Sequence, residues 1–191
     1  MNPHRPSPSR RLDSVVAIKH LTKADMIEKT PLTVTKDLTK RELTLERVLH
    51  APRDLVWEGW TRPEHISRWW GPRGWTTTFY EMDVRPGGVC HYCMRSDSGS
   101  APEVWGRAVY RVVDEPALLV YTEGHSDSSG ADLDDEPRTT SIAFVDQGEN
   151  TGLILRTQFP SLAKLERMLH MGMVEGLTMS LDRLAEQLDG R

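Results

Sequence analysis

The sequence predicts an α+β fold in which a curved antiparallel sheet closes around a long C-terminal helix. Residues 32–159 hold a succession of short segments of alternating polarity, and the short connections between them favour an antiparallel meander. Residues 162–188 then carry leucines at helical spacing. A single amphipathic helix after such a sheet has to bury its apolar stripe, and the concave face of the sheet is the surface available for it.

The boundaries of the elements follow from turn and capping residues. Strands are expected at Leu32–Lys36, Glu42–Leu49, Trp75–Arg85, Val89–Ser96, Val104–Glu115, Ala117–His125, Arg138–Asp146 and Thr151–Phe159. Two short helices are expected after the second strand, because Pro52 and Pro63 suit first helical turns and a Gly-Pro pair ends the segment. Ser161 is expected to cap one continuous helix over Leu162–Leu188.

The length of 191 residues suits one domain, residues 26–191, preceded by an extension, residues 1–25. Residues 1–11 of this extension are rich in Pro, Ser and Arg, and the extension is expected to be disordered or mobile. A chain that begins at Met26, which is also a candidate natural start, is expected to melt within a few degrees of the longer chain. The extension holds five Lys or Arg against two Asp, so residues 26–191 carry a formal net charge of −7 within the total of −4.

This charge distribution and the absence of long apolar runs limit the partners. An acidic domain repels phosphate backbones, so no nucleic acid is expected as a partner. No apolar run approaches the ~20 residues of a membrane span, and no signal-peptide core follows the N-terminal arginines. We therefore expect no membrane partner and a cytoplasmic location, as a monomer or a homodimer.

The tryptophans are concentrated in one stretch of the chain. Five of the six fall within Ala51–Gly88, namely Trp57, Trp60, Trp69, Trp70 and Trp75. Tryptophan has to be buried in a core or to line a pocket, with its indole N–H near a polar partner. The stretch therefore places much of the rigid apolar surface of the molecule in one region.

Several motifs in and around this stretch resemble one known family, in the same order. They are Arg47 through Ala51-Pro52, the helix from Trp57 to Trp60, Trp69-Trp70-Gly71-Pro72, Met82 through Gly88, and Leu181-Asp182-Arg183-Leu184. From about Met26 to Leu188 the sequence resembles the START-like (SRPBCC) superfamily, and within it the bacterial homologues of the C-terminal domain of the heat-shock protein 90 ATPase activator. This resemblance implies the helix-grip fold, also called birch-allergen-like, with a cavity between the C-terminal helix and the sheet.

The expected C-terminal helix carries Gly172 and Gly176 on one face, among four methionines. Because glycine inside a helix costs about 1 kcal/mol relative to alanine, something is expected to approach closely there. Tight packing of the helix on a strand is one explanation, and a cavity with adaptable methionine walls is the other. If the second holds, Gly172→Leu should fill the cavity and leave the fold intact or more stable. If the first holds, the same change should overpack the core and destabilise it by ~1–3 kcal/mol.

Strand alternation predicts which side chains face the helix. The inward residues are expected to be Cys90, Tyr92, Met94, Gly106, Ala108, Tyr110, Val112, Leu119, Tyr121, Glu123, Ile142, Phe144, Leu153 and Leu155. The candidate ligand-binding residues are Trp57, Trp60, Trp69, Trp70, Tyr92, Tyr110, Tyr121, Glu123, Met168 and Gly172. An inward Glu123 has to find a partner, whereas a place at the rim near His125 would leave it in water. We prefer the rim position, since Glu is mostly exposed in proteins.

No metal or cofactor is predicted. Cys90 and Cys93 have the spacing of a redox or zinc motif, but within a strand they point to opposite faces, so Cys→Ser at either position should not change the metal content. The acidic loop Ser126–Pro137 lacks the regular spacing of a calcium loop. It is expected to be solvated and mobile, and is a candidate cover for a pocket.

The leading hypothesis is the binding of an apolar or aromatic small molecule in the cavity between the C-terminal helix and the sheet, without catalysis. The first alternative is a cyclase-like, dehydratase-like or hydrolase-like enzyme that uses Glu123, Tyr110 or Tyr121 as acid–base groups. Enzymes on this fold use scattered pocket residues, so the lack of a catalytic motif does not exclude one. The second and least favoured alternative is stimulation of a chaperone ATPase.

Overall fold

A computed structural model describes residues 30–134 and 136–190. The expected extension, residues 1–25, and its boundary at Met26 lie outside the described residues and stay predictions. The strands are β1 (Thr33–Asp37), β2 (Glu42–Leu49), β3 (Trp75–Met82), β4 (Val89–Ser96), β5 (Val104–Asp114), β6 (Leu118–His125), β7 (Arg138–Gln147) and β8 (Asn150–Gln158). The helices are α1 (Arg53–Thr61), α2 (Pro63–Ile66), α3 (Leu162–His170) and α4 (Met173–Asp189). Every expected strand is present, with ends that differ by three residues or fewer.

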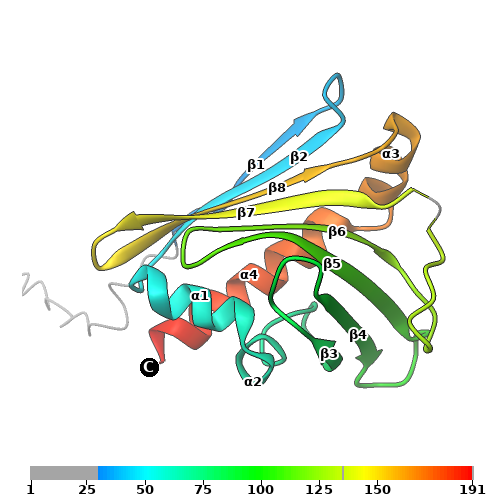
Figure 1. Ribbon diagram of the computed structural model, residues 1–191, viewed down its shortest axis with the longest axis horizontal. Coiled ribbons are helices and arrows are strands. Elements are labelled where there is room, and N and C mark those ends of the chain that lie inside the picture. The colour runs from blue at the N-terminus through cyan, green and yellow to red at the C-terminus, as the bar shows by residue number, and fades with distance from the viewer. Residues whose placement is uncertain (1–29, 135, 191) are drawn as a thin grey trace, which may run out of the picture.

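The eight strands form one antiparallel sheet in the order β1-β2-β8-β7-β6-β5-β4-β3. Strands β3 to β8 follow one another as a meander, and the β1–β2 hairpin is added beside β8. The sheet curves around α4, while α1 and α2 lie near the C-terminal end of that helix (Figure 1). This arrangement is the predicted helix-grip fold. In the described part of the chain, no helix has the length and the hydropathy to cross a membrane.

The tryptophans of α1 and of the segment after α2 form the centre of the core. Trp57 and Trp60 occupy the buried side of α1, and Trp69 is fully buried. The rings of Trp60 and Trp69 lie 4.6 Å apart, and Trp57 packs edge-on against Phe144 of β7 at 5.3 Å. The Trp69 indole N–H donates a hydrogen bond of 2.8 Å to the carbonyl oxygen of Gly59. The apolar spacing of α1 therefore serves packing, with the polar end of Trp69 satisfied inside the core.

The C-terminal helix is interrupted, contrary to the expectation of one continuous helix. Ser161 does cap the start, since its hydroxyl accepts a hydrogen bond from Lys164 N at 3.2 Å. α3 then ends at His170 and α4 begins at Met173, with Gly172 between them in the left-handed conformation at φ 82°. Only glycine adopts this conformation without strain. Gly172 is therefore the joint between two helices, where a leucine side chain would be strained, and Gly172→Leu is now expected to destabilise the fold.

Strand alternation identifies the core face of the sheet correctly, with one exception in β5. Val112 is 41% exposed, although it was expected to face inward. The register of the β5–β6 pair shifts between Tyr110 and Val112, so the alternation reverses and Val113 packs against the core instead. A bulge of this kind inserts one residue into a strand and changes the side on which each later residue lies.

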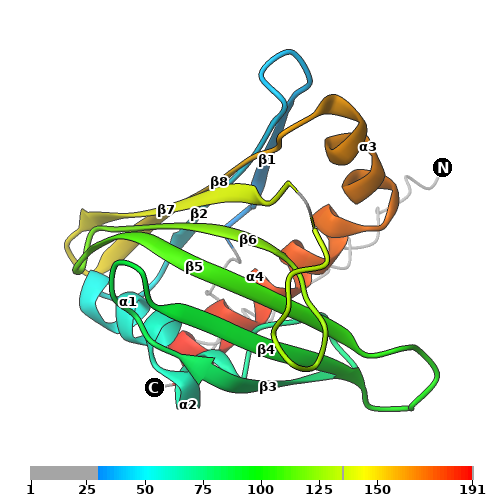
Figure 2. The ribbon, with the colours of Figure 1, turned by 45° about the vertical axis from the view of Figure 1, so that its right-hand side comes forward.

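The β6–β7 loop lies on the outer face of the sheet, where it passes across β5 and β4 (Figure 2). Asp132 of the loop pairs with Arg107 of β5 at 3.1 Å, and the carbonyl oxygen of Asp127 lies 3.2 Å from the His91 ring of β4. An isolated bridge joins Ser126 to Asp132. Among the described residues of this loop, none lines the internal cavity, so the loop does not cover it as expected.

Candidate functional site

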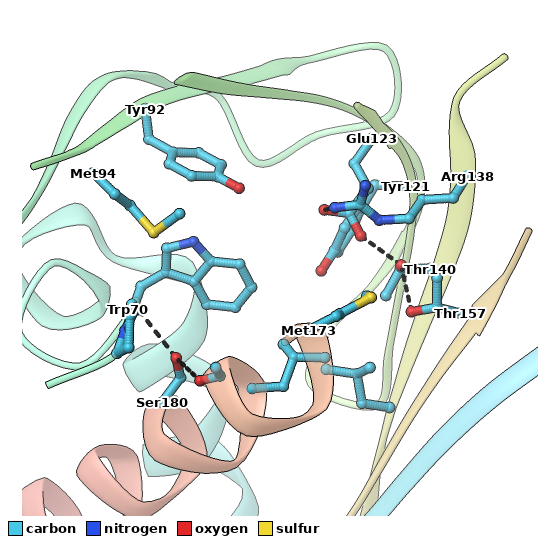
Figure 3. A pocket seen from close by; sticks show the side chains of 15 residues that line it. Trp70, Tyr92, Met94, Tyr121, Glu123, Arg138, Thr140, Thr157, Met173 and Ser180 are labelled. Carbon is cyan, nitrogen blue, oxygen red and sulfur yellow. Dashed lines mark hydrogen bonds and ion pairs between the residues drawn. The ribbon is translucent and has the colours of Figure 1, made fainter. Parts of the chain in front are cut away.

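A cavity of about 150 Å³ lies between the first turns of α4 and the concave face of the sheet. Strands β4, β6, β7 and β8, helix α4 and the segment after α2 contribute its walls. The lining residues are Trp70, Gly71, Pro72, Tyr92, Met94, Tyr121, Glu123, Arg138, Thr140, Leu155, Thr157, Met173, Gly176, Leu177 and Ser180. The charged pair and the two threonines gather at one side, across from Trp70 and Met94 (Figure 3).

A buried ion pair forms the polar side of the cavity. Glu123 of β6 and Arg138 of β7 are register partners on adjacent strands. Glu123 Oε2 and Arg138 Nη2 lie 3.1 Å apart, and the two side chains are only 9% and 12% exposed. The rim position preferred for Glu123 from the sequence is therefore wrong, because a charged partner on the neighbouring strand makes the inward position tolerable.

Two threonines continue the hydrogen bonding from this pair. Thr140 Oγ1 donates to Glu123 Oε1 at 2.6 Å and lies 3.0 Å from Thr157 Oγ1. Because the single hydroxyl hydrogen of Thr140 goes to the carboxylate, Thr157 has to be the donor in the second hydrogen bond. Both oxygens of Glu123 are thus engaged, and both threonine hydrogens are used within the group.

Two phenols, Tyr92 and Tyr121, extend into the space between the polar side and Trp70 (Figure 3). Burial raises the pKa of both phenols above the ordinary value, and the nearby Glu123 carboxylate is the second cause. Both therefore stay protonated at neutral pH. In that form a phenol donates a hydrogen bond, and it cannot serve as a base.

Tyr92 reaches its position because β5 carries a glycine beside it. Gly106 is the register partner of Tyr92, and a Cβ at Gly106 would lie 2.5 Å from the Tyr92 ring and 2.6 Å from its hydroxyl oxygen. The ring therefore lies across β5, toward β6. Any larger residue at position 106 would displace it.

Helix α4 closes the opposite wall. Ser180 donates a hydrogen bond to the carbonyl oxygen of Gly176 at 2.9 Å and accepts one from Gly71 N at 3.1 Å. These bonds connect α4 with the segment after α2. No atom lies within 4 Å of where a Cβ at Gly176 would stand, so the wall has open space at this turn.

The ten sequence-predicted binding residues separate into three groups. The cavity is lined by Trp70, Tyr92, Tyr121 and Glu123. These four also line a smaller adjoining cavity of about 30 Å³, together with Trp60 and Tyr110. Away from both cavities lie Trp57 and Trp69 in the core, Met168 in a groove beside α3, and Gly172 at the helix joint.

Sequence reasoning missed Arg138, Thr140 and Thr157 as site residues. The signal was present, because Arg138 and Thr140 share the parity of the buried Ile142 and Phe144 on one strand. The same holds for Thr157, which alternates in phase with two buried leucines of β8. A polar residue in phase with a buried face indicates a partner across the sheet.

The two cysteines lie on opposite sides of the sheet, as alternation predicts. Cys90 belongs to the core, whereas Cys93 lies beside Glu103, and both are free thiols. Burial raises the pKa of the Cys90 thiol to about 12. Within residues 30–134 and 136–190, no three His, Cys, Asp or Glu side chains are placed to share a metal ion.

The sheet, the enclosed helix and the cavity between them define a START-like helix-grip domain. Residues 50–189 match the family described as Activator of Hsp90 ATPase homolog 1-like protein. The chain belongs to this family. No curated protein matches the chain.

Solved structures with the same fold come from several bacteria. A crystal structure of a protein from Mycobacterium smegmatis is 26% identical with a TM-score of 0.76, over 83% of this chain and 97% of that one. A solution NMR structure of a protein from Arthrobacter aurescens is 24% identical with a TM-score of 0.77, over 83% and 92% of the two chains. A Silicibacter pomeroyi protein named for the same family is 20% identical with a TM-score of 0.63, over 78% and 97%. These likenesses show the shared fold.

Proposed function

We propose that this protein binds an apolar small molecule in the cavity between α4 and the sheet. The observation that carries the proposal is the buried Glu123–Arg138 pair in the wall of an otherwise largely apolar cavity. Taking two charges out of water costs several kcal/mol per ion, and apolar residues in their place often give an equal or more stable fold. The presence of the pair is therefore better explained by a role other than stability, and orienting a ligand is such a role.

Two methionines of the lining suit a ligand with an apolar body. Met94 and Met173 have flexible side chains that adapt to different shapes. Met173 and Gly176 are both partly exposed, although they also line the cavity. These observations support entry of a ligand at the first turns of α4.

The same geometry gives less support to the enzyme alternative. The phenols of Tyr110 and Tyr121 have pKa values raised mainly by burial, so neither is a base at neutral pH. Both oxygens of Glu123 are engaged by Arg138 and Thr140. The groups proposed as acid–base residues are therefore better suited to hold a ligand than to accept a proton from it.

Activation of a chaperone ATPase, named in the family description, would use an external surface. A variant whose cavity is filled from inside would keep that activity and lose ligand binding. The cavity experiment below therefore separates the two functions. The cytoplasmic location and the monomeric or homodimeric state stay predictions.

The experiment fills the cavity from α4. Gly176→Leu places a side chain where a Cβ meets nothing within 4 Å, and leucine is the better helix former by about 1 kcal/mol. The variant is expected to be at least as stable as the wild type but to lose binding of toluene, followed by NMR shift changes and by the melting temperature. Glu175→Leu, which adds the same side chain at the exposed neighbouring position, is the matched control.

In the wild type and in Glu175→Leu, saturating toluene is expected to raise the melting temperature by a few degrees. Native mass spectrometry of freshly purified protein would show whether a small molecule copurifies. A wild type that neither binds toluene nor carries a copurified molecule would contradict the proposed function. Equal toluene binding by Gly176→Leu would place the ligand elsewhere.

A further inference from the structure

The hydrogen-bonding groups of the cavity indicate the chemistry of a ligand, on the premise that the cavity binds one as proposed above. Thr140, Thr157 and Ser180 all give their hydroxyl hydrogens to protein acceptors. No hydrogen bond joins the hydroxyl of Tyr92 or of Tyr121 to an acceptor among the described residues, and the buried Nε of Arg138, another donor of the lining, also has no partner there. Donors that face a cavity without a protein partner favour a ligand that brings an acceptor, because leaving a donor unpaired in a closed site is costly.

The charges around these donors favour a neutral acceptor. Arg138 is neutralised by Glu123 at 3.1 Å, so no net positive charge faces the cavity. An anionic ligand would have to lose its hydration beside the Glu123 carboxylate without a free cation to compensate. A carbonyl oxygen, in contrast, accepts two hydrogen bonds and carries no charge.

The volume of the cavity limits the apolar part of the ligand. A cavity of about 150 Å³ is comparable in size to an engineered apolar cavity of about 150 Å³ in another protein that holds one benzene molecule. The wall across from the polar side includes Trp70 and Met94 (Figure 3), whose apolar surfaces suit a flat ring. One aromatic ring with a small substituent therefore fits.

We propose that the ligand is a neutral, single-ring aromatic molecule that bears a carbonyl oxygen and accepts hydrogen bonds from Tyr92 and Tyr121. The ring lies against the Trp70 side of the cavity, and the oxygen faces the two phenols. The Glu123–Arg138 pair discriminates against the corresponding carboxylate.

Three molecules of nearly equal shape test this class in the full-length protein: acetophenone, α-methylstyrene with CH₂ in place of the carbonyl oxygen, and benzoate. Tyr121→Phe and Tyr92→Phe remove one hydroxyl each and keep the rings. Tyr80→Phe, at a position 55% exposed on the sheet, is the control. Dissociation constants come from calorimetry, and melts confirm that each variant folds.

Each cavity variant is expected to weaken acetophenone binding by about threefold to tenfold and to change α-methylstyrene binding by less than about twofold. The different hydration of the two ligands cancels, because each is compared between wild type and variant. Tyr80→Phe should change neither. The carbonyl stretching frequency of bound acetophenone should be lower in the wild type than in Tyr121→Phe, which reports the hydrogen bond independently of affinity.

Equal losses for acetophenone and α-methylstyrene, or tighter binding of benzoate than of acetophenone, would overturn the carbonyl assignment. Toluene binding without acetophenone binding would also overturn it, and the proposed function would stand in all these cases. If the wild type binds none of the four molecules and carries no copurified small molecule, both proposals fall.

Discussion

The interior of this protein has two ends that use aromatic residues differently. At the tryptophan end, beneath α1, the rings of Trp57, Trp60, Trp69 and Phe144 pack directly together with centroids 4.6 to 5.9 Å apart. At the cavity end, beside the first turns of α4, the aromatic rings instead surround about 150 Å³ of space. Trp70 lies between the two ends, with its ring 5.5 Å from Trp69 and 6.1 Å from Tyr92.

The comparison shows that the features of the tryptophan end stabilise the fold, whereas those of the cavity end do not. At the tryptophan end the one indole hydrogen bond described above is satisfied by the backbone, so packing and polarity both stabilise the fold. At the cavity end two phenol donors, two buried charges and an open space are each unfavourable for stability alone. Binding a ligand at the cavity end would offset all three.

The largest expected loss of stability comes from a substitution at the tryptophan end. Trp69→Ala removes a fully buried ring and leaves a cavity among close-packed neighbours, so the free energy of unfolding should fall by about 3–5 kcal/mol in urea melts. Trp105→Ala, at a partly exposed position in β5, is the matched control and should lose clearly less. Equal losses would mean that the tryptophan end is not the principal core.

The second effect tests whether the ion pair serves stability. Arg138→Met leaves Glu123 buried without its charged partner and should lower the free energy of unfolding by roughly 3 kcal/mol. The double variant Glu123→Leu with Arg138→Met should recover most of that loss, because well-packed apolar residues often replace a buried pair without penalty. Urea melts measure both. A double variant as unstable as the single one would make the pair a structural feature, like the tryptophan end.

The fold was largely predictable from the sequence because its signals are local. Alternation located every strand, and the capping serine located the start of α3. The helix joint at Gly172 was missed because glycine is compatible both with a helix interior and with a left-handed joint. The bulge after Tyr110 was missed because Val112 and Val113 are both apolar, so the sequence does not indicate which of the two faces inward.

The site was only partly predictable, for a reason that concerns pairs of residues. The environment of Glu123 depends on which residue of β7 lies opposite, and that register is fixed by strand pairing across the β6–β7 loop. Tyr92 lies across β5 only because Gly106 is its register partner. Propensity assigns a residue to a strand, but it does not specify the residue beside it on the next strand.

The third prediction uses the close approach of Gly106 to the Tyr92 ring to disturb the cavity end alone. Gly106→Ala brings a Cβ to within 2.5 Å of the Tyr92 ring, so the ring has to move and the free energy of unfolding should fall by about 1–3 kcal/mol. Gly176→Ala, with open space around its Cβ, should instead gain up to about 1 kcal/mol. Melts of both variants give the signs. A stabilised Gly106→Ala would show that Tyr92 moves freely and that the cavity end is not preorganised.

The smallest effect concerns Cys90, which lines the smaller cavity where the two ends meet. Burial raises the pKa of its thiol from an ordinary value of 9.0 to about 12. The unfolded chain therefore releases this proton at lower pH than the folded protein does. The corresponding stability is complete below pH 9 and is lost as the pH rises toward about 12.

Cys90→Ser removes this pH dependence, since a hydroxyl does not ionise in the same range, and it should cost about 1 kcal/mol at pH 7 because it places a polar group among apolar side chains. Urea melts of wild type and variant at pH 7 and pH 10 measure both effects. The wild type should lose more stability between the two pH values than Cys90→Ser does. Equal losses would mean that Cys90 ionises in the folded protein, so that water reaches the boundary between the two ends and the tryptophan end is not sealed from the cavity.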